Sequence, residues 1–263
     1  MTSLNKIQEN WEGFAQADPL WAICTDLKRR GGGWTQKEFF ATGEREISKI
    51  MEYVRSLGLS PVNTDAALDF GCGVGRLTSA LSQYFDKCWG VDISPTMIQL
   101  AKDFHKNNSR CNFWLNEVDH LHRFEDGYFG FIYTSITLQH IPMRYVRNYL
   151  LELLRVLKPG GTFVFQIPDR DKRGIPLKVE SFLGVRKHLK RLRIGNGIGA
   201  LHMEMNCFPE EKIREVFSSQ GVRIVDVKLT NSTDRSFNGD LQFLEREPEG
   251  RRISKQYCVV KTA

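Results

Sequence analysis

The fold of this chain is indicated most clearly by one stretch, Ala67-Leu68-Asp69-Phe70-Gly71-Cys72-Gly73-Val74-Gly75-Arg76-Leu77. An apolar run over residues 66–70 leads into three glycines that alternate with other residues, and an apolar stretch at helical spacing follows over residues 76–85. The pattern predicts a buried strand, a tight turn and a helix. Glycines in the turn would let the backbone approach a ligand closely, next to the free N–H groups at the start of the helix.

The same alternation of strand and helix continues along the chain. We expect strands at 66–70, 88–92, 112–116, 129–134 and 162–167, with helices at 76–85, 94–106 and 142–156. Strands that alternate with helices indicate a mostly parallel sheet with helices on both faces. Residues 36–57 add a helix upstream, and residues 209–221 add one downstream. The last strands, 222–230 and 256–262, are joined by a loop, which predicts an antiparallel pair.

The composition is that of a globular protein, with 263 residues that are 41% hydrophobic and 26% charged. We expect one domain over 1–263, built from an N-terminal arm and helix (1–60), a ligand-binding core (61–168), a basic insertion after the fifth strand (169–206) and a closing helix with strands (207–263). No apolar run is long enough to span a membrane, and the first residues do not form a signal peptide. The six cysteines form no Cys-x-x-Cys pair, so we expect free thiols and a cytoplasmic location.

The basic character of the chain is concentrated in one segment. Residues 170–194 contain nine basic and two acidic side chains, so this segment alone exceeds the net charge of +6 of the whole chain. Apolar residues at helical spacing over 179–193 predict a basic amphipathic helix. Such a helix could contact an anionic membrane surface, bind an anionic acceptor, cover the sheet or present a solvated face.

The second predicted strand ends in an acid, Asp92, 21 residues after Gly71. A carboxylate in this place can accept hydrogen bonds from both hydroxyls of a ribose, which predicts a pocket for an adenosine-type ligand. The dinucleotide pattern needs a further glycine where Arg76 stands. Asp69 ahead of the turn would repel a pyrophosphate but suits a ligand with an ammonium or sulfonium group. A tight turn without a ligand is the alternative.

From about residue 66 to 168 the sequence resembles class I S-adenosylmethionine-dependent methyltransferases, in particular the broad type 11 group of small-molecule enzymes. The matching stretches are LDFGCGVGRL, GVDISPTMIQLAK, FGFIYTSITLQHIP and LRVLKPGGTFVF. The resemblance implies a doubly wound, Rossmann-like α/β fold with a seven-stranded, mostly parallel sheet whose last strand is antiparallel. It implies S-adenosylmethionine as the cofactor and S-adenosylhomocysteine as the product.

The resemblance also implies which residues bind the cofactor. The amino-acid part would be held by Asp69, Gly71, Cys72 and Gly73. Asp92 would bind the ribose, and the adenine would lie between Ile93 and Met97. Where the family usually has an acid near the adenine amino group, this chain has Asn116 and Glu117, and either could make the contact. Thr134, at the end of the fourth strand, completes the expected set.

Two histidines are the candidate catalytic residues, because a hydroxyl acceptor has to lose its proton and a histidine at the pocket can take it. His140 follows the fourth strand, where Tyr133, Ser135 and Gln139 are weaker candidates for the wall; its alternative role is packing. His202 belongs to the sequence HMEMN, in which an extended chain would place His202, Glu204 and Asn206 on one face and both methionines on the other. That polar face could contact the acceptor or simply face outward.

The function expected from these observations is O-methylation of a small-molecule, glycan or lipid-linked acceptor, perhaps an anionic one. The alternatives are an N-methyltransferase, a nucleic-acid methyltransferase or a noncatalytic S-adenosylmethionine-binding protein. The absence of an Asn/Asp-Pro-Pro-Tyr/Phe motif after the fourth strand argues against nucleic acid as the partner, as does the single basic segment without aromatic residues between its charges. We expect no metal site, because His120 and His122 have no further ligands at a recognised spacing.

Overall fold

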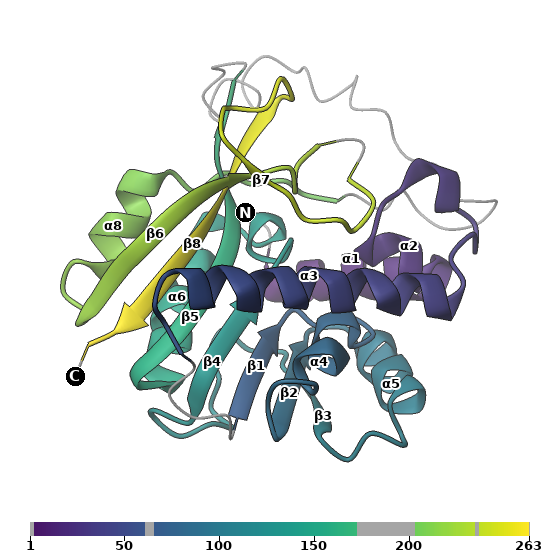
Figure 1. Cartoon of the computed structure of the whole chain (residues 1–263). Coiled ribbons are helices and arrows are strands. Elements are labelled where there is room, and N and C mark those ends of the chain that lie inside the picture. The colour runs from purple at the N-terminus through teal and green to yellow at the C-terminus, as the bar shows by residue number, and fades with distance from the viewer. Residues whose placement is uncertain (1–2, 61–65, 173–202, 235–236, 263) are drawn as a thin grey trace.

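The computed structural model describes residues 3–60, 66–172, 203–234 and 237–262, and within them one sheet of eight strands forms the centre of the molecule (Figure 1). The strand order is β3-β2-β1-β4-β5-β8-β6-β7. The strands are β1 (Ala66–Phe70), β2 (Lys87–Asp92), β3 (Cys111–Leu115), β4 (Phe129–Thr134), β5 (Leu157–Asp171), β6 (Val222–Thr230), β7 (Phe243–Leu244) and β8 (Arg252–Lys261).

The first five strands pair in parallel, and β8 runs antiparallel between β5 and β6. The strand order reverses between β1 and β4, and at such a switch point a parallel sheet leaves a crevice beyond the carboxyl ends of its strands. The mostly parallel sheet and its antiparallel closing pair are confirmed. The strand number of seven is corrected to eight, because the loop after β6 folds back and pairs β7 with Leu229 and Thr230.

Helices cover both faces of this sheet, as Figure 1 shows. On one face α3 and α4 pack over a cluster that includes Ile47, Leu77 and Phe131, while α6 and α8 pack over the other face against Phe163 and Tyr257. The helical elements are α1 (Leu4–Ala17), α2 (Pro19–Ile23), η1 (Leu27–Arg29), α3 (Gln36–Ser56), α4 (Arg76–Leu81), α5 (Pro95–Phe104), η2 (Leu138–His140), α6 (Met143–Val156) and α8 (Glu210–Phe217).

Local sequence explains where the helices beside the crevice begin. Ser94 caps α5 by accepting a hydrogen bond from the backbone N–H of Met97, and Pro95 occupies the first turn, where its missing N–H costs nothing. Gly75 precedes α4 with a left-handed φ of 83°, which a glycine adopts without strain. These two starts place the beginnings of α4 and α5 at the ends of β1 and β2.

Some expectations concern residues outside the described ranges. The amphipathic helix at 179–193 and His202 lie there, together with most of the basic insertion at 169–206. All six cysteines are described, and each is a free thiol, as expected. None of the helices in the described ranges combines the length and the apolar character that crossing a membrane requires.

Candidate functional site

A cavity of about 280 Å³ lies at the carboxyl ends of β1, β2 and β4, where the sheet topology leaves its crevice. The glycine turn and the end of β2 line one part of it. The helices α1 and α2 close it on a second side, while the turn after β4, the segment 203–205 and the loop after β6 close it on a third. Segments that are far apart in the sequence therefore build a single pocket.

Asp92 is held rigidly at the wall of this cavity. Its Oδ2 accepts a hydrogen bond from the backbone N–H of Gly73 at 2.8 Å, and its Oδ1 accepts one from Ser94 at 2.9 Å. Burial raises the pKa of Asp92, while these backbone hydrogen bonds act in the opposite direction. Each carboxylate oxygen keeps a further lone pair, so the oriented side chain can accept hydrogen bonds from two neighbouring hydroxyls.

The glycine turn forms part of the cavity wall with its backbone, but the N–H groups of Gly71 and Cys72 are not hydrogen-bond donors for a ligand. Gly71 has a φ of +80°, and a Cβ atom there would lie 2.2 Å from the Thr137 side chain. The backbone N–H groups of Gly71 and Cys72 both donate to the carbonyl of Val91, so they are not available to a ligand. Gly71, Cys72 and Gly73 line the cavity as expected, but through the closely approaching backbone.

The structure distinguishes between Asn116 and Glu117. Asn116 is 3% exposed and lines the cavity, and its Oδ1 atom has no hydrogen-bond partner among the described residues, while its Nδ2 donates to Val118. Glu117 does not line the cavity, and its side chain accepts a hydrogen bond from Gln8. A buried acceptor without a partner is costly, so Asn116 is the residue that fits an adenine amino group. Ile93 and Met97 line the same part of the cavity.

Two of the expected cofactor residues, Asp69 and Thr134, do not line the cavity. Asp69 is buried beneath the turn, where its Oδ2 accepts a hydrogen bond from Thr78 at 2.7 Å. Burial raises the pKa of Asp69 to about 7, with the Thr78 hydrogen bond opposing the change. Thr134 is fully buried and donates to the carbonyl of Phe70 at 2.7 Å. Asp69 thereby connects β1 to α4, and Thr134 connects β4 to β1, while the Oδ1 atom of Asp69 is buried without a hydrogen-bond partner among the described residues.

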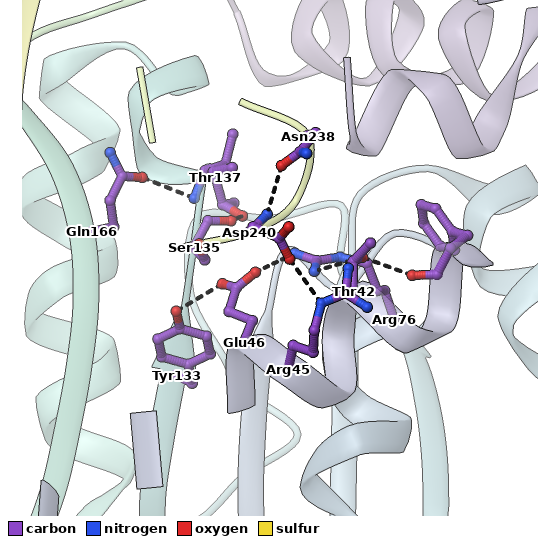
Figure 2. Close-up of polar contacts among 12 residues, drawn as sticks. Thr42, Arg45, Glu46, Arg76, Tyr133, Ser135, Thr137, Gln166, Asn238 and Asp240 are labelled. Carbon is purple, nitrogen blue, oxygen red and sulfur yellow. Dashed lines mark hydrogen bonds and ion pairs between the residues drawn. The ribbon is translucent and has the colours of Figure 1, made fainter. Parts of the chain in front are cut away.

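A buried ionic group that the sequence analysis missed stands behind the glycine turn (Figure 2). Arg76 lines the cavity and is 3% exposed, and its guanidinium binds Glu46 of α3 at 2.7 Å and Thr42 at 3.2 Å. Tyr133 donates to the other oxygen of Glu46 at 2.8 Å. Arg76 stands in the motif itself, but nothing in the local sequence indicated that Glu46, 30 residues upstream, would be its partner.

The helix α1 is attached to the segment after β2, next to Asp92, by two polar side chains. Glu12 accepts hydrogen bonds from the Ser94 hydroxyl at 2.7 Å and from the Thr96 backbone and hydroxyl, while Gln8 donates to the carbonyl of Ile93. Burial raises the pKa of Glu12, but the hydrogen bonds from Thr96 and Ser94 together outweigh it and lower the pKa. The carboxylate therefore holds α1 closed over the start of α5.

We expect Glu12→Ala to speed the dissociation of S-adenosylhomocysteine about tenfold, because it removes charge-assisted hydrogen bonds that hold α1 over the pocket. Stopped-flow fluorescence of Trp11, which lines the cavity, would measure the rate. Glu9→Ala is the matched control, since Glu9 is an exposed residue of the same helix whose carboxylate pairs with Lys6. Equal rates for both variants would show that the attachment of α1 does not limit release.

His140 lies at the cavity but does not have the surroundings of a general base. Its Nδ1 is 2.6 Å from the carbonyl of Glu204, its Nε2 is 3.2 Å from the Gln139 amide nitrogen, and its ring packs edge-on against Trp11. Burial lowers the pKa of His140 to about 4, so the ring is neutral at pH 7 and a weak proton acceptor. The alternative role, a packed wall residue, agrees with this geometry.

The remaining wall of the cavity combines apolar side chains with a carboxylate. Met203 and Met205 line it, whereas Asn206 turns away and hydrogen-bonds to the carbonyls of Gln139 and Ile141. Of the described residues of HMEMN, the two methionines line the cavity and Asn206 does not, so the expected acceptor contact of the polar face stays a prediction. The loop after β6 adds Ser232, Thr233, Asp234 and Phe237, none of which the sequence analysis had singled out.

Parts of the chain are similar in sequence to known methyltransferases. Residues 68–165 match the family described as "Methyltransferase domain". The chain is 33% identical over 177 residues to the 2-methyl-6-phytyl-1,4-hydroquinone methyltransferase of Synechocystis sp., an alignment that covers 66% of this chain and 54% of the relative. It is 29% identical over 127 residues to the 2-heptyl-1-hydroxyquinolin-4(1H)-one methyltransferase of Mycobacteroides abscessus, covering 48% and 52% of the two chains. The chain thus spans about half the length of these relatives.

Among solved structures, the fold is similar to that of a magnesium protoporphyrin IX methyltransferase from Synechocystis PCC 6803 with bound S-adenosylhomocysteine. The TM-score is 0.61 at 14% sequence identity, and the superposition covers 99% of this chain and 100% of the other. A methyltransferase structure from Clostridium acetobutylicum superposes with a TM-score of 0.58 over 90% of this chain, at 16% identity. These likenesses extend across the described elements beyond residues 68–165.

Proposed function

Residues 68–165 form a class I S-adenosylmethionine-dependent methyltransferase domain, and from this premise we propose that the protein O-methylates a small, largely apolar acceptor. The observation that carries the proposal is the composition of the cavity next to the cofactor residues. Trp11, Met203, Met205 and Phe237 are among the residues that line this cavity. Such a wall would bury an apolar ring or chain, at about 25 cal/mol for each Å² removed from water.

The cofactor fits the other end of the cavity on the evidence of this chain's residues. The oriented carboxylate of Asp92 suits a ribose, and the partnerless Oδ1 of Asn116 suits an exocyclic amine. When bound, S-adenosylmethionine supplies an activated methyl group on a sulfonium. The contribution of the chain is therefore to hold the acceptor in line with this group and to exclude water, for which α1 and α2 form the cover.

An acceptor hydroxyl also needs a group that takes its proton, and Asp234 is the group we assign to this step. Asp234 lines the cavity, and none of the described residues donates a hydrogen bond to its carboxylate or pairs with it. Burial raises the pKa of Asp234, which makes the carboxylate a stronger base than an exposed one. The same negative charge disfavours an anionic acceptor at this end. The case for an anionic acceptor rests on residues 173–194, outside the described ranges.

A methyl-transfer assay over a small acceptor panel tests the proposal. The panel comprises a prenylated hydroquinone, a 1-hydroxyquinolin-4-one, a sterol and phosphoethanolamine, with transfer of labelled methyl from S-adenosylmethionine as the measured quantity. We expect activity with the apolar hydroxyl compounds and none with phosphoethanolamine. Methylation of phosphoethanolamine alone would contradict the apolar acceptor, and cofactor binding without transfer to any compound would favour a noncatalytic binding protein.

We further expect Asp234→Asn to lower kcat about 100-fold with little change in the affinity for S-adenosylhomocysteine, because the amide cannot take a proton. Asp240→Asn is the matched control on the same loop, since its carboxylate pairs with Arg45 instead of lining the cavity. Initial rates against acceptor concentration, together with calorimetry, separate the two effects. Unchanged kcat in Asp234→Asn would remove this residue from the reaction.

A further inference from the structure

A chain of hydrogen bonds, in which every group donates in the same direction, runs behind the part of the cavity wall that Ile136, Gln139 and His140 form. The backbone N–H of Ile136 donates to Gln166 Oε1 at 2.9 Å, and Gln166 Nε2 donates to Gln139 Oε1 at 3.3 Å. Gln139 Nε2 lies 3.2 Å from His140 Nε2, and His140 Nδ1 lies 2.6 Å from the carbonyl oxygen of Glu204. Figure 2 shows Gln166 reaching toward the turn between Ser135 and Thr137.

The two ends of this chain determine the orientation of every group between them. A backbone N–H can only donate, so Gln166 has to turn its oxygen to Ile136 and its NH₂ group to Gln139. Gln139 then accepts with its oxygen and offers its own NH₂ group to His140, whose Nε2 must accept. From the other end, the carbonyl of Glu204 can only accept, so Nδ1 of His140 must carry the proton. Both arguments assign the same neutral tautomer.

The chain is buried and it supports a strained turn. Gln166 is fully buried on β5 and also donates to Ser254 at 2.6 Å, while Gln139 is 2% exposed. Ile136 has a φ of 57°, the one positive φ of a residue other than glycine in the described ranges. A β-branched residue in this conformation costs on the order of 1–3 kcal/mol, and such strain persists where surrounding contacts impose it. Ile136 lines the cavity, as do the methionines on either side of Glu204.

We propose that Gln166 is a positioning residue that fixes the direction of the Gln139 amide, keeps His140 neutral with its proton on Nδ1, and thereby orders the acceptor wall. His140 then holds the carbonyl of Glu204 and, with it, the segment that carries Met203 and Met205. This role explains why a histidine lines the cavity without a nitrogen free for base catalysis. Only the kinetic part of the proposal rests on the proposed function.

The test compares Gln166→Met with Gln256→Met. Gln256 is the matched control, because it is fully buried, lies opposite Gln166 in the register of β5 and β8, and forms no hydrogen bond with Gln139 or His140.

Without Gln166 the Gln139 amide can turn its oxygen to His140 Nε2, which stabilises the imidazolium. We therefore expect the pKa of His140 to rise from about 4 toward its ordinary value in Gln166→Met only. Arg252, the charged group that also lowers this pKa, is unchanged in both variants.

Nuclear magnetic resonance of ¹⁵N-labelled histidine follows both the tautomer and the titration, with His140→Gln identifying the signal. Calorimetry with S-adenosylhomocysteine and the KM for the panel's prenylated hydroquinone complete the measurement. We expect unchanged affinity for S-adenosylhomocysteine. The KM for the hydroquinone should rise about tenfold, because a displaced wall segment no longer positions the acceptor. Gln166→Asn, which is too short to span both partners, provides a second variant if the methionine variant does not fold.

Three results would overturn the proposal. One is a His140 that titrates in Gln166→Met and Gln166→Asn as it does in the unsubstituted protein. Another is an equal change in Gln256→Met, which would reduce Gln166 to a packing role. The third is a wild-type His140 with its proton on Nε2. The titration of His140 needs no acceptor. A methylation panel without activity would therefore contradict the proposed function, whereas the role of Gln166 would still be decided by the titration.

Discussion

Asp92→Ala is expected to weaken the binding of S-adenosylhomocysteine by about 100-fold or more. The carboxylate is the oriented acceptor for the ribose, and hydrogen bonds to a charged group contribute about 1.5–3 kcal/mol each. The substitution also leaves the backbone N–H groups of Gly73 and Ser94 without their acceptor, which loosens the turn and the start of α5. Isothermal titration calorimetry with S-adenosylhomocysteine measures the loss directly.

Two comparisons make this result specific. Asp86→Ala removes an exposed carboxylate just before β2 and is expected to bind like the unsubstituted protein. Asp92→Asn keeps an oxygen acceptor but loses the charge, so its affinity for S-adenosylhomocysteine should lie between those of Asp92→Ala and Asp86→Ala. Thermal unfolding without ligand verifies that each variant is folded. An Asp92→Ala protein that is folded and retains full affinity would contradict the placement of the cofactor at this end of the cavity.

Glu46→Ala is expected to destabilise the fold by about 3–5 kcal/mol, the cost of leaving a buried charge without its partner. Glu46 is 1% exposed and binds both Arg76 and the Tyr133 hydroxyl, so its removal leaves the buried Arg76 without a counter-charge and the Tyr133 hydroxyl without this acceptor. Urea unfolding followed by circular dichroism gives the free energy of unfolding. The surface pair Lys6–Glu9 is the control, for which Glu9→Ala should cost less than about 1 kcal/mol.

The double substitution Glu46→Leu with Arg76→Met separates lost charge balance from lost packing. Apolar side chains of similar volume can replace a buried pair at little cost, so the double variant should regain most of the stability that Glu46→Ala loses. Arg76 also lines the cavity, so the double variant should still bind S-adenosylhomocysteine less well than the unsubstituted protein. A loss below about 1 kcal/mol in Glu46→Ala would mean that water reaches the guanidinium.

The sequence predicted the parts of the site that a few neighbouring residues define. Asp92 at the end of a strand and the glycines at 71 and 73 lie as expected, because strand ends and tight turns depend on local residue types. Asn116 and Glu117 show the limit of such arguments. Adjacent side chains of a chain leaving a strand point in different directions, and Gln8 of the distant helix α1 decides the environment of Glu117.

The roles of the polar residues were harder to predict. His140 was expected at the pocket and lies there, but its suitability as a base depends on Gln139 and on the carbonyl of Glu204, which lies 64 residues further on. Asp234 was missed because the loop after β6 has no motif. Its place at the cavity follows only from the position of β6 beyond β8 in the sheet.

By itself, the sequence determined the alternation of strands and helices, the tight glycine turn and the carboxylate at the end of the second strand. These features arise from residues close together along the chain, where periodicity and backbone preference act. Only the tertiary structure decided which polar groups are paired and which face the cavity. The physical reason is that burial and hydrogen-bond partners set the charge and direction of a side chain. Segments such as α1, α3 and the loop after β6 supply those partners from far away in the sequence.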